Sequence, residues 1–130
     1  MKKTIFNWAL FGCILFIATM IAGTCSASAP FISYVKSNSM EPLIKVNDAI
    51  FIMPAKDYEI GDIVMYRPLA LNAEYITHRI TDTGEKGYIT QGDNSPYTDQ
   101  ESDEPQLTKD RIVGRVLTIR GKPVVLPAVG

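Results

Sequence analysis

Cysteine is scarce in this chain of 130 residues, and the two cysteines lie close to the amino end. Cys13 and Cys25 fall within and just after an apolar run. On one helix they would be about 18 Å apart, which is far beyond the reach of a disulfide. From residue 30 onward there is no cysteine. Such a domain suits either side of a membrane, so cysteine usage decides nothing about the redox compartment.

Positive charge is also in short supply. Once Lys2 and Lys3 are set aside, 11 basic residues face 14 acidic ones, so the part beyond residue 30 has a net charge near −3. This balance gives no basic stripe that would favour nucleic acid as a partner. The chain has one histidine, His78, and a single histidine without cysteine in the domain argues against a zinc site. We expect neither a metal nor a cofactor.

The amino end carries the long apolar run. Residues 5–22 hold no charge, and with 23–29 they make about 25 residues, enough to cross a hydrocarbon core of ~30 Å. A cleaved signal is the alternative, because Ala27-Ser28-Ala29 resembles a cleavage site, but its apolar region has only about 7–15 residues. Length favours an uncleaved anchor, and Lys2 and Lys3 predict a cytoplasmic amino end. We therefore expect a single-pass membrane protein, with a cytoplasmic end at residues 1–4, a transmembrane signal anchor in lipid at 5–25, and a domain at 30–130 on the extracytoplasmic or lumenal side.

Beyond residue 30, short apolar segments are separated by turn residues, and no 3.6-residue period is sustained. About 100 residues support one domain with little surplus core. Residues 93–110 form a long acidic loop, of a kind that is usually functional or disordered. The pattern predicts an all-β, mostly antiparallel domain, with strands at residues 31–36, 49–53, 62–67, 74–81, 87–91, 112–119 and 123–126.

The first candidate for chemistry is the serine cluster Ser37-Asn38-Ser39-Met40-Glu41-Pro42. A serine becomes a nucleophile only with a base beside it and with donors for the developing oxyanion. Ser37 offers a second hydroxyl two residues before Ser39, and Asn38 tolerates unusual backbone angles. The same hexapeptide is also consistent with a plain polar turn.

Two further segments carry titratable groups. Strand alternation puts His78 on one face with Ile76 and Ile80. A histidine on such an apolar face needs a polar partner, and this holds for a structural histidine as well as for a catalytic one. Gly92-Asp93-Asn94-Ser95-Pro96-Tyr97-Thr98-Asp99 alone indicates an Asx-type turn. The alternating acids and closing Glu of a calcium loop are missing there.

Together these segments resemble the signal peptidase family, in the Ser-His-Asp branch of the endoplasmic reticulum, archaea and some Gram-positive bacteria. The resemblance covers residues 31 to about 126, and the order of the segments and the apolar run in front agree with it. It is carried by residues 37–42, Gly61-Asp62-Ile63-Val64, and residues 75–80 and 92–99. It implies a signal-peptidase-like β domain that needs no metal or cofactor.

Carried over by this resemblance, Ser39 is the nucleophile and His78 is the general base, at a position where typical bacterial relatives have a lysine. The family spacing of Gly-Asp and a second Asp six residues later falls on Asp93 and Asp99. It favours Asp99 as the triad acid, with Asp93 as an alternate or a support. The implied oxyanion donors are the Ser39 backbone N–H and the Ser37 hydroxyl.

The activity implied is serine endoproteolysis that removes signal peptides from preproteins, which would dock as an added strand and be cut after small residues. Asn38 departs from the glycine usual in the family, a change that we expect to be tolerated. Relatives often continue beyond the position of Gly130, and for this reason we expect other secretion or peptidase subunits as further partners. Two alternatives stay open. One is a non-catalytic exported β accessory or binding domain. The other is a self-cleaving peptidase of the SOS-repressor or phage type, which would need a lysine where His78 stands.

Overall fold

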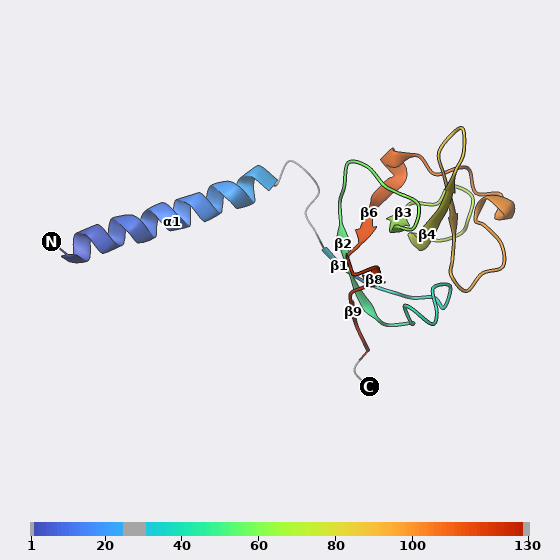
Figure 1. The fold of residues 1–130 in the computed structure, drawn as a ribbon, viewed down its shortest axis with the longest axis horizontal. Helices are drawn as coiled ribbons and strands as arrows, with labels where there is room; N and C mark the ends of the chain where they lie inside the picture. Colours follow the sequence, from blue (N-terminus) through green and yellow to red (C-terminus); the bar gives the residue numbers. More distant parts are fainter. Residues whose placement is uncertain (1, 25–30, 129–130) are drawn as a thin grey trace.

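The computed structural model describes residues 2–24 and 31–128. One helix, α1 (Lys2–Thr24), precedes a β-rich body, and Figure 1 shows the helix as a rod separate from the folded strands. The β-rich body fits the expected all-β domain.

The transmembrane helix expected at residues 5–25 is wrong. Within the described residues, no helix is both long and apolar enough to cross a membrane. The spanning helix is therefore removed from the fold class, and the β domain remains.

The strands are β1 (Phe31–Tyr34), β2 (Ala49–Met53), β3 (Ile63–Tyr66), β4 (Ile76–Thr83), β5 (Tyr88–Gln91), β6 (Ile112–Val116), β7 (Thr118–Ile119), β8 (Lys122–Pro123) and β9 (Val125–Leu126). They form an antiparallel sheet with the strand order β1-β2-β6-β3-β4-β5, and β9 also pairs with β2. A small ribbon of β7 and β8 lies outside this sheet. Two 3₁₀ turns, η1 (Gln100–Ser102) and η2 (Lys109–Arg111), lie between β5 and β6.

The expected strand at 112–119 divides at Leu117. The Leu117 N–H donates to Phe51 O at 2.8 Å, and the Leu117 carbonyl accepts from Val124 N–H at 2.9 Å, so this residue joins the main sheet to the ribbon. The ribbon then turns at Arg120 and Gly121, whose φ angles are 53° and 77°. Two adjacent left-handed residues match the twist of a tight hairpin.

Two apolar clusters lie on opposite faces of β3. Positions 63 and 65 of this strand enter the cluster that contains Met40, and positions 64 and 66 enter the cluster that contains Ile80. Successive side chains of a strand point to opposite faces, so β3 is buried on both sides. Ile76 also packs against the second cluster. Alternation along β4 therefore turns His78 toward the face on which Tyr66 lies.

Candidate active site

Ser39 lies in the turn after β1, and that turn is fixed from two sides. Met40 beside it is buried in the first apolar cluster. From the loop after β5, the backbone N–H of Asn94 donates to Ser39 O at 2.8 Å, and the Asn94 side-chain amide donates to Asn38 O at 3.0 Å. These contacts hold the serine backbone in place.

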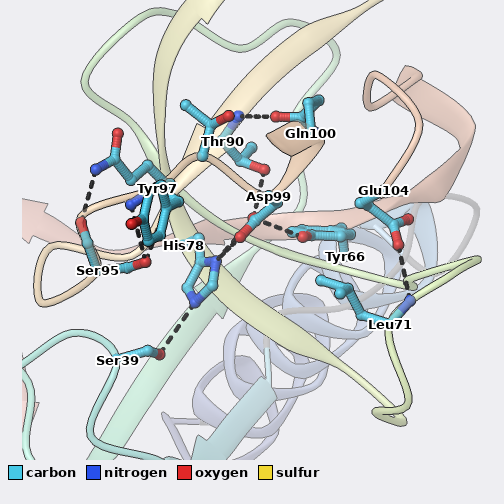
Figure 2. Close-up of polar contacts among 12 residues, drawn as sticks. Ser39, Tyr66, Leu71, His78, Thr90, Ser95, Tyr97, Asp99, Gln100 and Glu104 are labelled. Carbon is cyan, nitrogen blue, oxygen red and sulfur yellow. Dashed lines mark hydrogen bonds and ion pairs between the residues drawn. The ribbon is translucent and has the colours of Figure 1, made fainter. Parts of the chain in front are cut away.

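Ser39, His78 and Asp99 form one continuous hydrogen-bonded array (Figure 2). His78 Nε2 lies 3.0 Å from Ser39 Oγ, and His78 Nδ1 lies 2.7 Å from Asp99 Oδ2 and 2.8 Å from Oδ1. An ionised carboxylate only accepts hydrogen bonds, so Nδ1 must carry the proton and donate. Nε2 is then free to accept the Ser39 hydroxyl proton, which is the arrangement a general base requires.

Asp99 is held as a carboxylate by buried donors. The Tyr66 hydroxyl donates to Asp99 Oδ2 at 2.7 Å, and the Thr90 hydroxyl donates to the same oxygen at 2.6 Å. Burial alone raises the pKa of Asp99, but the hydrogen bond and charge of His78, with the two hydroxyl donors, outweigh it and hold the pKa below its usual value. Asp99 in turn raises the pKa of Tyr66, on top of the larger effect of burial, so the phenol stays protonated as a donor.

Ser37 lies directly beside the proposed nucleophile. Its hydroxyl oxygen is 3.0 Å from Ser39 Oγ. An oxyanion forms next to the attacking oxygen, so a hydroxyl at this distance is within reach of it. This position is compatible with the predicted role of the Ser37 hydroxyl as an oxyanion donor, and the role of the Ser39 N–H stays a prediction.

Asp93 is not brought to His78. Both of its carboxylate oxygens accept hydrogen bonds from Arg79, at 2.9 Å each, and Arg79 also donates to Gly61 O at 2.9 Å. The Asp93 backbone N–H donates weakly to Met40 Sδ at 3.4 Å. Of the two acids predicted from the sequence, Asp99 contacts the histidine and Asp93 braces the start of the loop.

A family model described as Peptidase S24-like matches residues 17–117 of the chain. The chain belongs to the Peptidase S24-like family. The superfamily includes signal peptidase I, LexA and UmuD, so the domain is of the serine peptidase type and the protein is a protease at this level. A comparison with curated protein sequences finds no match. The individual roles of Ser39, His78 and Asp99 in this S24-like peptidase stay predictions.

Tyr66 and Thr90, which support the acid, were not predicted from the sequence. Tyr66 stands at the end of an apolar strand and Thr90 within another strand, and both are fully buried. Both hydroxyls reach Asp99 from different strands of the sheet, and neither residue belongs to a local sequence motif. The one available signal is that a buried Tyr or Thr hydroxyl needs a partner.

Gly92 of the S24-like peptidase is required for space. A Cβ at this position would lie 2.7 Å from Ser39 O and 3.0 Å from His78 Nε2. Gly92→Ala is therefore expected to push Ser39 and His78 apart and to lower turnover of a peptide substrate by about 10²-fold, measured with the thermal midpoint alongside. Gly12→Ala is the control, because nothing lies within 4 Å of its Cβ. Turnover of Gly92→Ala within about twofold of wild type would show that the contact is not strained.

Proposed function

We propose that this S24-like peptidase is a Ser-His-Asp endopeptidase that removes signal peptides from exported proteins and cuts after small residues. The observation that supports it is the array of Ser39, His78 and Asp99 opening onto a groove of about 560 Å³. The groove is lined by residues 33–37, 39–40, 65 and 73–78. Location of residues 31–128 on the exported side of a membrane belongs to the same proposal.

The groove suits an extended peptide. Val35 uses its N–H on Asp48 O at 2.9 Å and its carbonyl on Asn47 N–H at 2.7 Å. Backbone groups alternate in direction along an extended strand, so we expect those of Tyr34 and Lys36, which line the groove, to point away from residues 47 and 48. A peptide lying there can pair with them as an added strand.

Apolar side chains line the groove near Ser39. Met40 and Met65 line it and are only 1% and 6% exposed, because both pack into the first apolar cluster. We expect this closely packed apolar lining to favour small side chains next to the cut. This supports cleavage after small residues.

The mechanism follows the array. As Ser39 Oγ attacks the peptide carbonyl carbon, His78 Nε2 accepts the hydroxyl proton, and Asp99 keeps Nδ1 protonated and stabilises the imidazolium. The Ser37 hydroxyl and the Ser39 N–H stabilise the oxyanion. His78 then gives its proton to the leaving amine, and a water molecule repeats the sequence to release the acyl group from Ser39.

The test uses the full chain and a peptide that carries Ala at the first and third positions before the cut. We expect mass spectrometry to find cleavage after the first-position Ala, and Ser39→Ala to abolish it. A matched peptide with Phe at the first position should resist. Labelling of Ser39 by a fluorophosphonate in wild type argues against a non-catalytic β domain. Cleavage of the chain's own backbone in place of the added peptide would favour the self-cleaving type.

A further inference from the structure

Glu104 is a buried acid for which the proposed mechanism has no use. It follows Asp99 in the loop after β5, and its side chain has no exposed surface. Its carboxylate accepts hydrogen bonds from three consecutive backbone N–H groups, at 2.7 Å from Leu69, 2.9 Å from Ala70 and 3.1 Å from Leu71 (Figure 2 draws the last). It also pairs with Arg111. One side chain thus satisfies the backbone of a whole turn.

Arg111 fixes the beginning of the same segment. Its Nε and Nη2 donate to Arg67 O at 3.1 and 2.9 Å, and its carbonyl accepts from Arg67 N–H at 3.0 Å. The Arg111 guanidinium also lies over the Tyr66 ring, 5.8 Å from its centroid. The pair of Glu104 and Arg111 therefore holds residues 67–71 and contacts the tyrosine that donates to Asp99.

The segment held in this way leads directly into one wall of the groove. Ala73, Glu74 and Tyr75 line the groove, and the Ala73 N–H donates to Leu71 O at 2.9 Å. Neither helix nor strand is found at residues 67–75. The conformation of this wall therefore depends on loop contacts, which include the three partly buried bonds to Glu104 and the bonds between Arg111 and Arg67.

We infer that Glu104 is a positioning residue that holds residues 67–75 as a wall of the groove and thereby sets the affinity for the peptide. This inference rests on the proposed function, because it assigns the groove to a peptide. Three N–H donors converging on one site need a carboxylate. An amide offers one acceptor oxygen and turns its own NH₂ toward the remaining donors, so the turn would move away and take the wall with it.

The charge state of Glu104 agrees with this role. Burial by itself raises the pKa of Glu104, but the three backbone N–H donors and Arg111 outweigh burial and hold the pKa below its usual value. The Glu104 carboxylate is therefore charged at neutral pH.

The test compares Glu104→Gln with Asp103→Asn in the full chain. Asp103 is an exposed acid in the same loop with φ of 69°, a conformation that Asn tolerates, so its variant makes the same charge change without touching the turn. In a Ser39→Ala background, we expect Glu104→Gln to weaken binding of the Ala-containing peptide about tenfold, by fluorescence anisotropy, and Asp103→Asn to leave it unchanged. With Ser39 intact, KM should rise by the same factor while kcat and fluorophosphonate labelling of Ser39 stay within about twofold.

Peptide affinity that is unchanged in folded Glu104→Gln overturns the inference, and so does a loss of labelling as large as the loss of cleavage. If Glu104→Gln does not fold, Arg111→Lys takes its place, because it keeps the charge and loses the second guanidinium bond to Arg67 O; weaker peptide binding is again expected. The proposed function is contradicted if the wild-type chain binds the peptide but neither cuts it nor is labelled at Ser39. In that case the comparison of peptide affinities still decides on the role of Glu104.

Discussion

Ser39→Ala and His78→Ala are each expected to lower peptide turnover by about 10⁴-fold or more, and the double variant is expected to be little worse than either. The reason is the single 3.0 Å contact between His78 Nε2 and Ser39 Oγ. Without the base the hydroxyl keeps its proton, and without the hydroxyl the base has nothing to activate, so the second loss adds little. Single-turnover kinetics on the full chain measure all three variants.

The matched control is His78→Lys, which keeps a titratable nitrogen at the position of the base. It should not restore turnover, because a lysine base must be desolvated to lower its pKa, and here an amine would lie against the Asp99 carboxylate, which favours its charged form. Half of the wild-type turnover in His78→Ala would contradict the assignment of His78. Thermal midpoints near that of wild type would show that the losses are chemical.

The strands were predictable because their pattern is local. Residues 49–53 form a short, wholly apolar segment between turn residues, and β2 has those bounds in the structure. The apolar run at residues 5–22 shows the limit of such reasoning. Composition alone predicted a spanning segment, whereas within the described residues no helix is both long and apolar enough to cross a membrane.

The candidate site was predictable to the extent that it is carried by motifs. Ser39, His78 and Asp99 each belong to a short segment whose order matches a known family, and the structure brings the three into contact. Glu104 and Tyr66 lie in no such segment. Glu104 accepts from residues 33 to 35 positions earlier, and the Tyr66 hydroxyl reaches an acid 33 positions later. Contacts of this range are created by the fold and leave no spacing in the sequence.

Asp99 and Asp93 differ in their surroundings, so their Asn variants should differ in their effects on turnover and on stability. Asp99→Asn is expected to lower kcat by about 10⁴-fold with the fold intact. The amide can donate to His78 Nδ1, which favours the tautomer with the proton on Nε2, and that nitrogen can then no longer accept the Ser39 proton. Tyr66 and Thr90 still donate to the remaining oxygen, so the thermal midpoint should change little.

Asp93→Asn should affect stability at least as much as chemistry. Its ion pair with Arg79 is partly solvated, with 24% and 28% of the two side chains exposed, so its loss should cost about 0.5–1 kcal/mol of unfolding free energy. Turnover should fall only slightly, because Asp93 has no contact with His78 and acts through the placement of the loop. Calorimetry and kcat measured on both variants decide between the acids. The assignment would be reversed by wild-type turnover in Asp99→Asn together with lost turnover and unchanged stability in Asp93→Asn. The reason is that the acid that orients the histidine cannot be neutralised without disturbing the tautomer on which proton transfer depends.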